Sequence, residues 1–237
     1  DNNIRSYLPE PFGAEELRDA DNRPRIPEPM VFDLVRPLGA TKGEAEINVL
    51  AIIPLSQRSA RSEWAPEVEL AIADGAALEF ELPFDEWTLE SYKMAGQWTF
   101  GTAFEDHFIH GVQSILLYDR ESNRWSPTLL YLAGVQFDEY WSMLIMAGLR
   151  TERGRGDRSE RTDRLFNFSL FRHLTDYVTA GVETNSSTSL SGRSEFRLMP
   201  QLHLELQENI MLQVGSGCLF APKGTIPESG FRLIYNF

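Results

Sequence analysis

The sequence predicts an all-β protein: a transmembrane antiparallel up-and-down β-barrel of about 12 strands with an extended N-terminal arm. Three observations predict it. Apolar and polar residues alternate along many segments, short and long polar connections largely alternate, and the chain ends on an aromatic residue. We expect the arm over residues 1–43 and the barrel over residues 44–237.

The composition is that of an acidic chain. Its 237 residues include 22 Lys and Arg and 35 Asp and Glu, which gives a net charge of −13. That charge argues against a nucleic-acid binder, because phosphate contacts need clustered cations. The sequence has no run of about 18 apolar residues, so no transmembrane helix is expected. A single cysteine, Cys218, excludes an internal disulfide and a cysteine-based zinc site.

Alternation is clearest in residues 196–207, FRLMPQLHLELQ. The even-numbered residues are apolar and the odd-numbered ones are mostly polar, so a strand here has one apolar and one polar face. A tilted strand of about 10 residues crosses a bilayer. Similar alternation occurs in residues 44–55, 67–73, 76–82, 141–150, 166–170 and 178–183.

Three segments alternate less cleanly and predict either β-bulges or apolar residues that face the lumen. They are residues 88–100, 107–118 and 125–137. With them the sequence predicts an even number of strands, as bacterial barrels require. The expected strands are 44–55, 67–73, 76–83, 88–101, 108–118, 125–137, 140–150, 163–172, 177–185, 194–206, 209–220 and 229–237.

The connections predict the orientation of the barrel. Outer-membrane barrels have short periplasmic turns and longer external loops. Tight periplasmic turns are expected at residues 74–75, 138–139, 173–176 and 207–209. Longer external loops are expected at residues 56–66, 119–124, 151–162, 185–193 and 221–230, with one short external turn near residues 84–87.

The N-terminal arm differs from the rest of the chain. Residues 1–29 hold five prolines and eleven charged residues, and they show no sustained period. They predict an extended segment with at most a helical turn at residues 14–19. Residues 30–38, MVFDLVRPL, have no place in the strand count. They are an extra strand of the wall, an arm inside the lumen or a periplasmic strand.

The C-terminal segment FRLIYNF resembles the last strand of bacterial outer-membrane β-barrels. Phe231, Leu233, Tyr235 and Phe237 share one face. In that class of protein, the terminal strand is the signal that the barrel-assembly machinery recognises. The resemblance implies the bacterial outer membrane as the location, with outer-membrane lipid and the assembly machinery as partners.

A wider resemblance covers residues 44–237. Residues 44–55 and the segment 64–84, which contains LEFELPF, resemble the outer-membrane transporter family named for the MetA pathway of phenol degradation. The later GVQ, WSP and AGL segments, at residues 111–113, 125–127 and 147–149, also fit that family. The resemblance implies a β-barrel of uncertain substrate, with no established catalytic residues. The arm lies outside it.

The predicted lumen is strongly acidic. If the apolar faces meet lipid, six glutamates from the first three strands share the interior: Glu44, Glu46, Glu67, Glu69, Glu79 and Glu81. Such carboxylates repel one another unless they are solvated, paired or partly protonated. The candidate cationic partners are Lys93, Arg150, Arg197 and Arg232. His203 and Glu205 are also expected to line the lumen. The set forms either a structural ion network or an acidic wall facing a basic one, which would select solutes.

No catalytic or cofactor motif is evident, so we expect no enzyme activity, cofactor or metal. Residues 151–164 hold five arginines and four acids; they form either a solvated loop or one that contacts lipopolysaccharide phosphates. The leading hypothesis for function is a porin-like channel that passively passes a small solute. The alternative is a structural or partner-binding barrel with a closed or occupied lumen, such as a sheath or anchor for an electron-transfer protein. In that case residues 1–29 would dock a periplasmic partner. A soluble ligand-binding sandwich is a third hypothesis.

Overall fold

The computed structural model describes residues 24–32, 34–56, 61–154 and 161–237. No helix in these ranges is long and apolar enough to cross a membrane. The strands are β1 (Ala45–Pro54), β2 (Glu63–Ala73), β3 (Ala76–Glu81), β4 (Phe84–Asp85), β5 (Thr88–Leu89), β6 (Ser91–Ala103), β7 (Phe108–Asp119), β8 (Arg124–Gln136), β9 (Trp141–Gly154), β10 (Arg161–Thr175), β11 (Val178–Ser189), β12 (Ser194–Gln207), β13 (Ile210–Ala221) and β14 (Gly224–Asn236).

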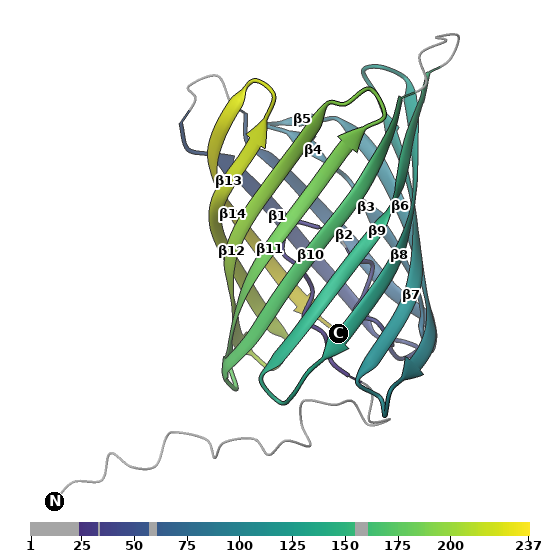
Figure 1. Cartoon of the computed structure of the whole chain (residues 1–237), viewed down its shortest axis with the longest axis vertical. Helices are drawn as coiled ribbons and strands as arrows, with labels where there is room; N and C mark the ends of the chain where they lie inside the picture. The colour runs from purple at the N-terminus through teal and green to yellow at the C-terminus, as the bar shows by residue number, and fades with distance from the viewer. Residues whose placement is uncertain (1–23, 33, 57–60, 155–160) are drawn as a thin grey trace, which may run out of the picture.

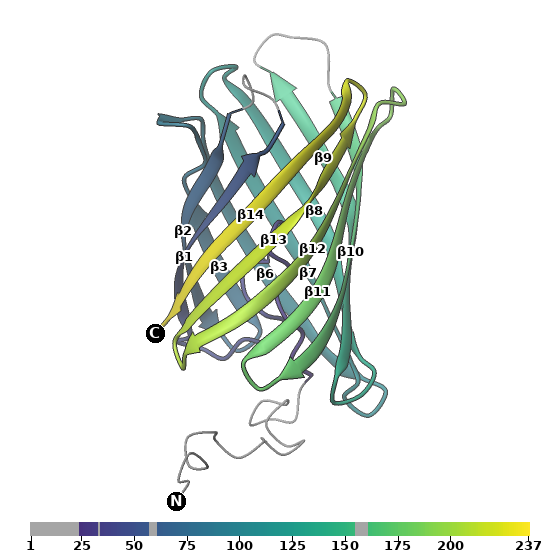
Figure 2. The same ribbon diagram turned by 90° about the vertical axis from the view of Figure 1, so that its left-hand side faces the viewer.

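Twelve of these strands close into an antiparallel barrel (Figures 1 and 2). Each strand of the ring pairs with the next strand of the ring, β3 with β6 across the intervening β4 and β5, and β1 pairs with both β2 and β14, which closes the ring. The short strands β4 and β5 stand apart from the ring as a hairpin that pairs with the start of β2. The predicted fold class is therefore confirmed.

Several connections are shorter than predicted. Strand β11 continues to Ser189 and β12 begins at Ser194, so most of the expected loop 185–193 is strand. The expected loop at residues 221–230 is also wrong: β14 begins at Gly224, so most of these residues are strand. Ladder hydrogen bonds join backbone groups, so polar segments such as residues 185–188 can pair beyond the apolar band. The sequence pattern marks where the apolar band ends rather than where the strand ends.

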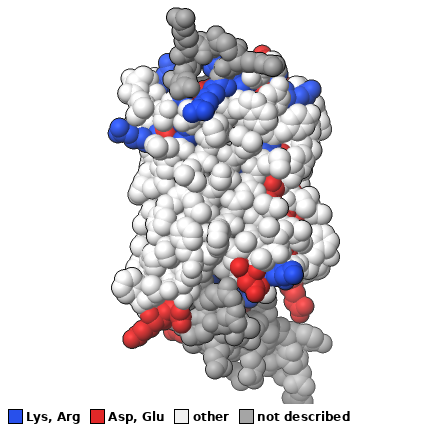
Figure 3. All heavy atoms as spheres, turned by 90° about the vertical axis from the view of Figure 1, so that its right-hand side faces the viewer, with Lys and Arg blue, Asp and Glu red and all other residues white. Residues whose placement is uncertain are grey.

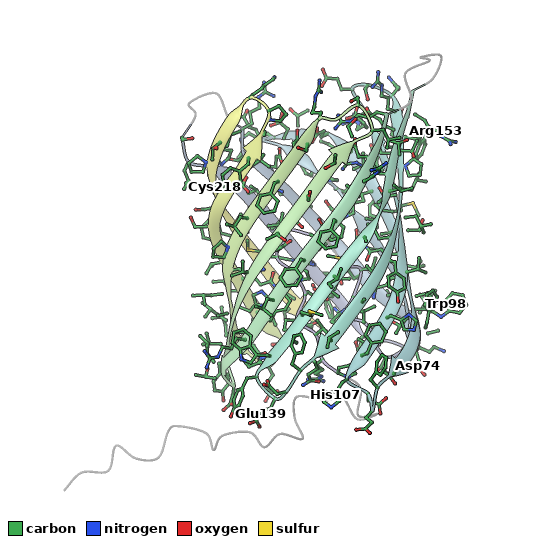
Figure 4. All side chains as sticks on the ribbon, in the orientation of Figure 1. Asp74, Trp98, His107, Glu139, Arg153 and Cys218 are labelled. Atoms are coloured by element: carbon green, nitrogen blue, oxygen red, sulfur yellow. The ribbon has the colours of Figure 1, made fainter. Side chains whose placement is uncertain are left out.

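The outer surface carries the apolar residues of the alternating strands. Val68 on β2 and Leu78 on β3 are 52% and 50% exposed, whereas Glu69 between them in the ladder is fully buried. Charged side chains gather toward the two ends of the barrel and leave the middle of the visible face largely uncharged (Figure 3). Trp98 projects outward from the wall (Figure 4). An uncharged belt of this kind is the surface that a barrel presents to lipid.

The three segments that alternate less cleanly contain both a β-bulge and apolar residues that face the lumen. Strand β6 carries a bulge between Thr99 and Gly101, where the φ angle of Gly101 is +140°. Strands β7 and β8 place Ile109, Leu130 and Leu132 inside the barrel, fully buried. The predicted bulges and the predicted apolar lumen residues therefore occur together.

The arm explains why apolar side chains lie inside. The trace of residues 24–32 and 34–40 runs within the barrel in both views (Figures 1 and 2). Ile26, Leu34 and Leu38 pack with buried residues of the inner wall: Ile109, Leu130, Leu132, Leu144, Met146, Leu165 and Phe171. Of the three placements left open for residues 30–38, the structure shows the one inside the lumen, and the described residues of this segment form no strand. The segment 1–23, including the expected turn at 14–19, lies outside the described residues.

Candidate functional site

The lumen has two chemically different walls. The inner faces of β1, β2, β3, β6 and β14 carry buried charged and amide side chains, whereas those of β7 to β10 include many apolar side chains. The arm lies between the walls and contacts both. We take the candidate site to be this occupied lumen.

Arg232 on β14 organises the polar wall. Its side chain is only 1% exposed. One terminal nitrogen, Nη2, lies 2.7 Å from Glu67 Oε1 and 3.2 Å from Glu69 Oε1, and Nε donates to Asn48 Oδ1 at 3.1 Å. The partners lie on β1 and β2, so the β1–β14 closure is what brings the last strand's guanidinium to the first strands' carboxylates. Arg232 is one of the four cations that the sequence indicates as candidate partners of these glutamates.

Lys93 on β6 forms ion pairs with the two buried glutamates of β3. Its ammonium group lies 3.0 Å from Glu79 Oε1 and also contacts Glu81. Cations and carboxylates are therefore interleaved on one wall, as in a structural ion network.

The other two predicted cations lie elsewhere in the lumen. Arg150 pairs with Asp163 at 3.1 Å, and Arg161 pairs with the same carboxylate at 2.9 Å. Arg197 pairs with Glu228. In the described part of the chain, the ion pairs of Arg150 and Arg197 are thus with carboxylates of their own neighbourhood rather than with the predicted glutamates.

Two charged residues of the site come from the arm, and the sequence analysis missed both. Arg36 forms ion pairs with Glu46 and, at 3.4 Å, with Glu44. Glu28 is 7% exposed and lies 3.6 Å from Arg232 Nη1. Burial, together with the nearby Glu46, raises the pKa of Glu28 to about 7. The one available signal was an arginine inside the apolar segment 30–38, which needs a buried partner if that segment is buried.

Backbone groups of the arm are also bound by the wall. Glu183 on β11 is fully buried, and its carboxylate accepts the N–H of Val31 at 3.0 Å and of Phe32 at 2.6 Å. Gln201 on β12 accepts the N–H of Met30 at 3.1 Å. These contacts fix an irregular segment whose amides have no ladder partner.

Two glycines make room for Met30. Gly215 on β13 and Gly230 on β14 face each other in the ladder. A Cβ atom added at these positions would lie 2.6 Å and 2.5 Å from Met30 Cε. Because these two glycines have no side chain, the wall has space for the end of the Met30 side chain.

The arm separates two cavities. The outer cavity, of about 350 Å³, is lined by arm residues 30–32 and by wall residues that include Glu81, Lys93 and Arg150. The inner cavity, of about 460 Å³, is lined by arm residues 24–28 and 36–40 and reaches Phe237 at the C-terminal end. Asp74, His107 and Glu139 lie at that end, and Arg153 lies near the other (Figure 4).

The remaining predicted residues either line the inner cavity or have side chains on the outer surface of the barrel. The side chain of Glu44 is 42% exposed at the mouth, His203 is buried against Gln201, and Glu205 lines the cavity. The terminal aromatic and apolar side chains face outward: Phe231, Leu233, Tyr235 and Phe237.

Known structures share this fold at low sequence identity. The NanC porin has a TM-score of 0.65 at 12% identity, covering 81% of this chain and 98% of its own. The KdgM porin, solved in complex with disordered oligogalacturonate, has a TM-score of 0.63 at 11% identity over 81% and 99%. The COG4313 outer-membrane channel from Pseudomonas putida F1 has a TM-score of 0.58 at 13% identity over 90% and 100%. These proteins are porins and channels rather than enzymes.

The sequence comparisons give a family but no curated relative. A family model described as HAEPLYID-like matches residues 25–236. No curated protein matches. The matched region includes the described arm, which the MetA-type resemblance left out. The chain therefore has the fold of bacterial outer-membrane β-barrels.

Proposed function

Since the chain belongs to the HAEPLYID-like family and has the fold of outer-membrane porins, we propose that it is a narrow channel for a small solute, closed by residues 24–40 of its own arm. The observation that carries the proposal is the pair of cavities separated by the arm. A barrel of this size lies between those filled by side chains, with about 8 strands, and open porins with about 16. A displaceable segment therefore suffices to open or close it.

Two further observations support passage rather than chemistry. The charged residues of the polar wall form ion pairs with one another, so a polar solute would meet a polar, ion-paired surface there. The MetA-type resemblance of residues 44–237 also supports a transport role.

The test is single-channel recording of the full chain in planar bilayers. We expect long closed periods interrupted by discrete openings, because the arm must leave the lumen before ions pass. A preparation that inserts but never opens at any voltage would contradict the channel function.

A second candidate function is a partner-binding barrel, and one observation favours it. The inner wall buries apolar arm residues such as Ile26 and Leu34 almost completely, as a site made to hold a peptide segment would. In this case the arm would connect the barrel to a periplasmic protein. Co-purification from native membranes, with and without residues 1–23, distinguishes the two, since this deletion retains the segment that fills the lumen.

We also propose the outer contacts that the sequence suggests. The outward side chains of Phe231, Tyr235 and Phe237 support recognition of the last strand by the barrel-assembly machinery. Arg153, near the end opposite the C-terminus, supports a contact with lipopolysaccharide phosphates (Figure 4).

A further inference from the structure

Where the polar wall meets the arm, buried acidic side chains outnumber buried basic ones. Four buried carboxylates, from Glu28, Glu46, Glu67 and Glu69, surround two buried guanidinium groups. When all are ionised, the group has a formal charge of −2. A net charge is costly to hold away from water unless a counter-charge compensates it.

Several carboxylate oxygens in this cluster have no hydrogen-bond partner. Both oxygens of Glu28 and Oε2 of Glu69 are buried without one. Glu28 is 7% exposed and Glu69 is fully buried, so water does not reach them freely. Arg232 Nη1 lies 3.6 Å from Glu28 Oε2 and Arg36 Nη1 lies 3.7 Å from Glu69 Oε2, both beyond hydrogen-bond distance. The shorter contacts of the two arginines are with Glu46 and with Oε1 of Glu69. Buried carboxylate oxygens without a donor need a cation or a proton.

The geometry of these oxygens fits a metal ion. One ligand oxygen each from Glu28, Glu46 and Glu69 lie within 4.8 Å of one another. Two oxygens that each bind one Ca²⁺ at about 2.4 Å are at most about 4.8 Å apart. The donor set consists of carboxylates alone, which hard divalent cations prefer. Glu28 and Glu46 also line the inner cavity, which gives an ion a route from the C-terminal mouth.

We propose that a hard divalent cation of the Ca²⁺ type binds between Glu28, Glu46 and Glu69. Because Glu28 belongs to the arm and the other two to β1 and β2, the ion clips the arm to the barrel wall. Its two charges neutralise the cluster. The neighbouring trio Glu67, Glu79 and Glu81 differs, because all three residues lie on β2 and β3 and an ion there would not attach the arm to the wall.

The test is calorimetric titration of the EDTA-washed full chain in detergent with CaCl₂ and with MgCl₂, at pH 8. We expect one saturable site per chain for at least one of the two ions, and an affinity at least tenfold lower in Glu28→Gln. The matched control is Glu205→Gln, which removes the same charge from the same cavity but lies outside the trio. It is expected to bind as wild type.

Absence of saturable binding to both ions would overturn the proposal. So would equal loss of affinity in Glu28→Gln and Glu205→Gln, which would indicate general screening of an acidic cavity. Heat-modifiable gel migration checks that each variant is folded. If Glu28→Gln does not fold, Glu69→Gln replaces it, with the same expected tenfold loss. The readout is binding, so its outcome is independent of whether the barrel conducts.

Discussion

Replacing Arg232 with alanine is expected to lower the free energy of unfolding of the barrel by about 3–5 kcal/mol. The guanidinium group is 1% exposed and contacts Glu67 and Glu69 from the last strand. Its removal leaves these carboxylates buried without their nearest cation at the seam where β14 meets β1, and only the longer contact of Glu69 with Arg36, at 3.7 Å, remains. Urea titration of the protein in lipid vesicles measures the effect.

The matched control for this variant is Arg61→Ala. Arg61 also forms an ion pair, with Asp85 at 2.9 Å, but its side chain is 63% exposed. Solvent screens such a pair, so the unfolding midpoint should not move. Arg232→Lys keeps the charge and should fall between wild type and Arg232→Ala. An Arg232→Ala protein that unfolds at the wild-type midpoint would contradict the role given to this residue.

Replacing Glu183 with alanine is expected to release the arm while the barrel stays closed as a ring. The carboxylate accepts the N–H groups of Val31 and Phe32, and hydrogen bonds to charged acceptors contribute about 1.5–3 kcal/mol each. Loss of both should weaken docking of the arm by about 3 kcal/mol or more, which corresponds to more than a hundredfold.

Release of the arm can be measured with a thiol reagent. In a Cys218→Ser background, Ile26→Cys places one thiol on the buried arm, and Glu183→Ala should raise its rate of reaction with a water-soluble maleimide. Glu152→Ala is the control, because Glu152 lines the outer cavity and pairs with Arg124 rather than with the arm. Unchanged reactivity in Glu183→Ala would show that this carboxylate does not hold the arm.

The barrel was predictable because each strand can be identified from the residues of its own segment. Alternation within a strand and the terminal aromatic need no knowledge of the rest of the chain. Residues 129–132 show where this local rule stops. Leu129 and Tyr131 face outward, whereas Leu130 and Leu132 are fully buried, and no sequence pattern distinguishes these two pairs. Apolar side chains are stable inside only because the arm covers them.

The arm itself could not be placed from sequence. Its position depends on contacts with partners far away in the chain, such as those of Met30 with Gln201 and of Glu28 with Arg232. Without that placement, Glu28 and Arg36 could not be assigned to the acidic cluster. The strands that contribute Glu46, Glu67 and Arg232 were predictable, so the wall of the site was found and its occupant was not.

The most direct test of the central claim, that the arm closes the lumen, is a reversible covalent lock. A Cβ atom added at Gly134 on β8 would lie 3.6 Å from Ile26 Cβ, within the range of about 3.5–4.5 Å that a disulfide needs. The variant is Ile26→Cys with Gly134→Cys in the Cys218→Ser background, recorded in planar bilayers. We predict no openings while the bond is intact and openings after addition of reductant. Equal openings before and after reduction, with the cross-link verified by mass, would contradict the claim.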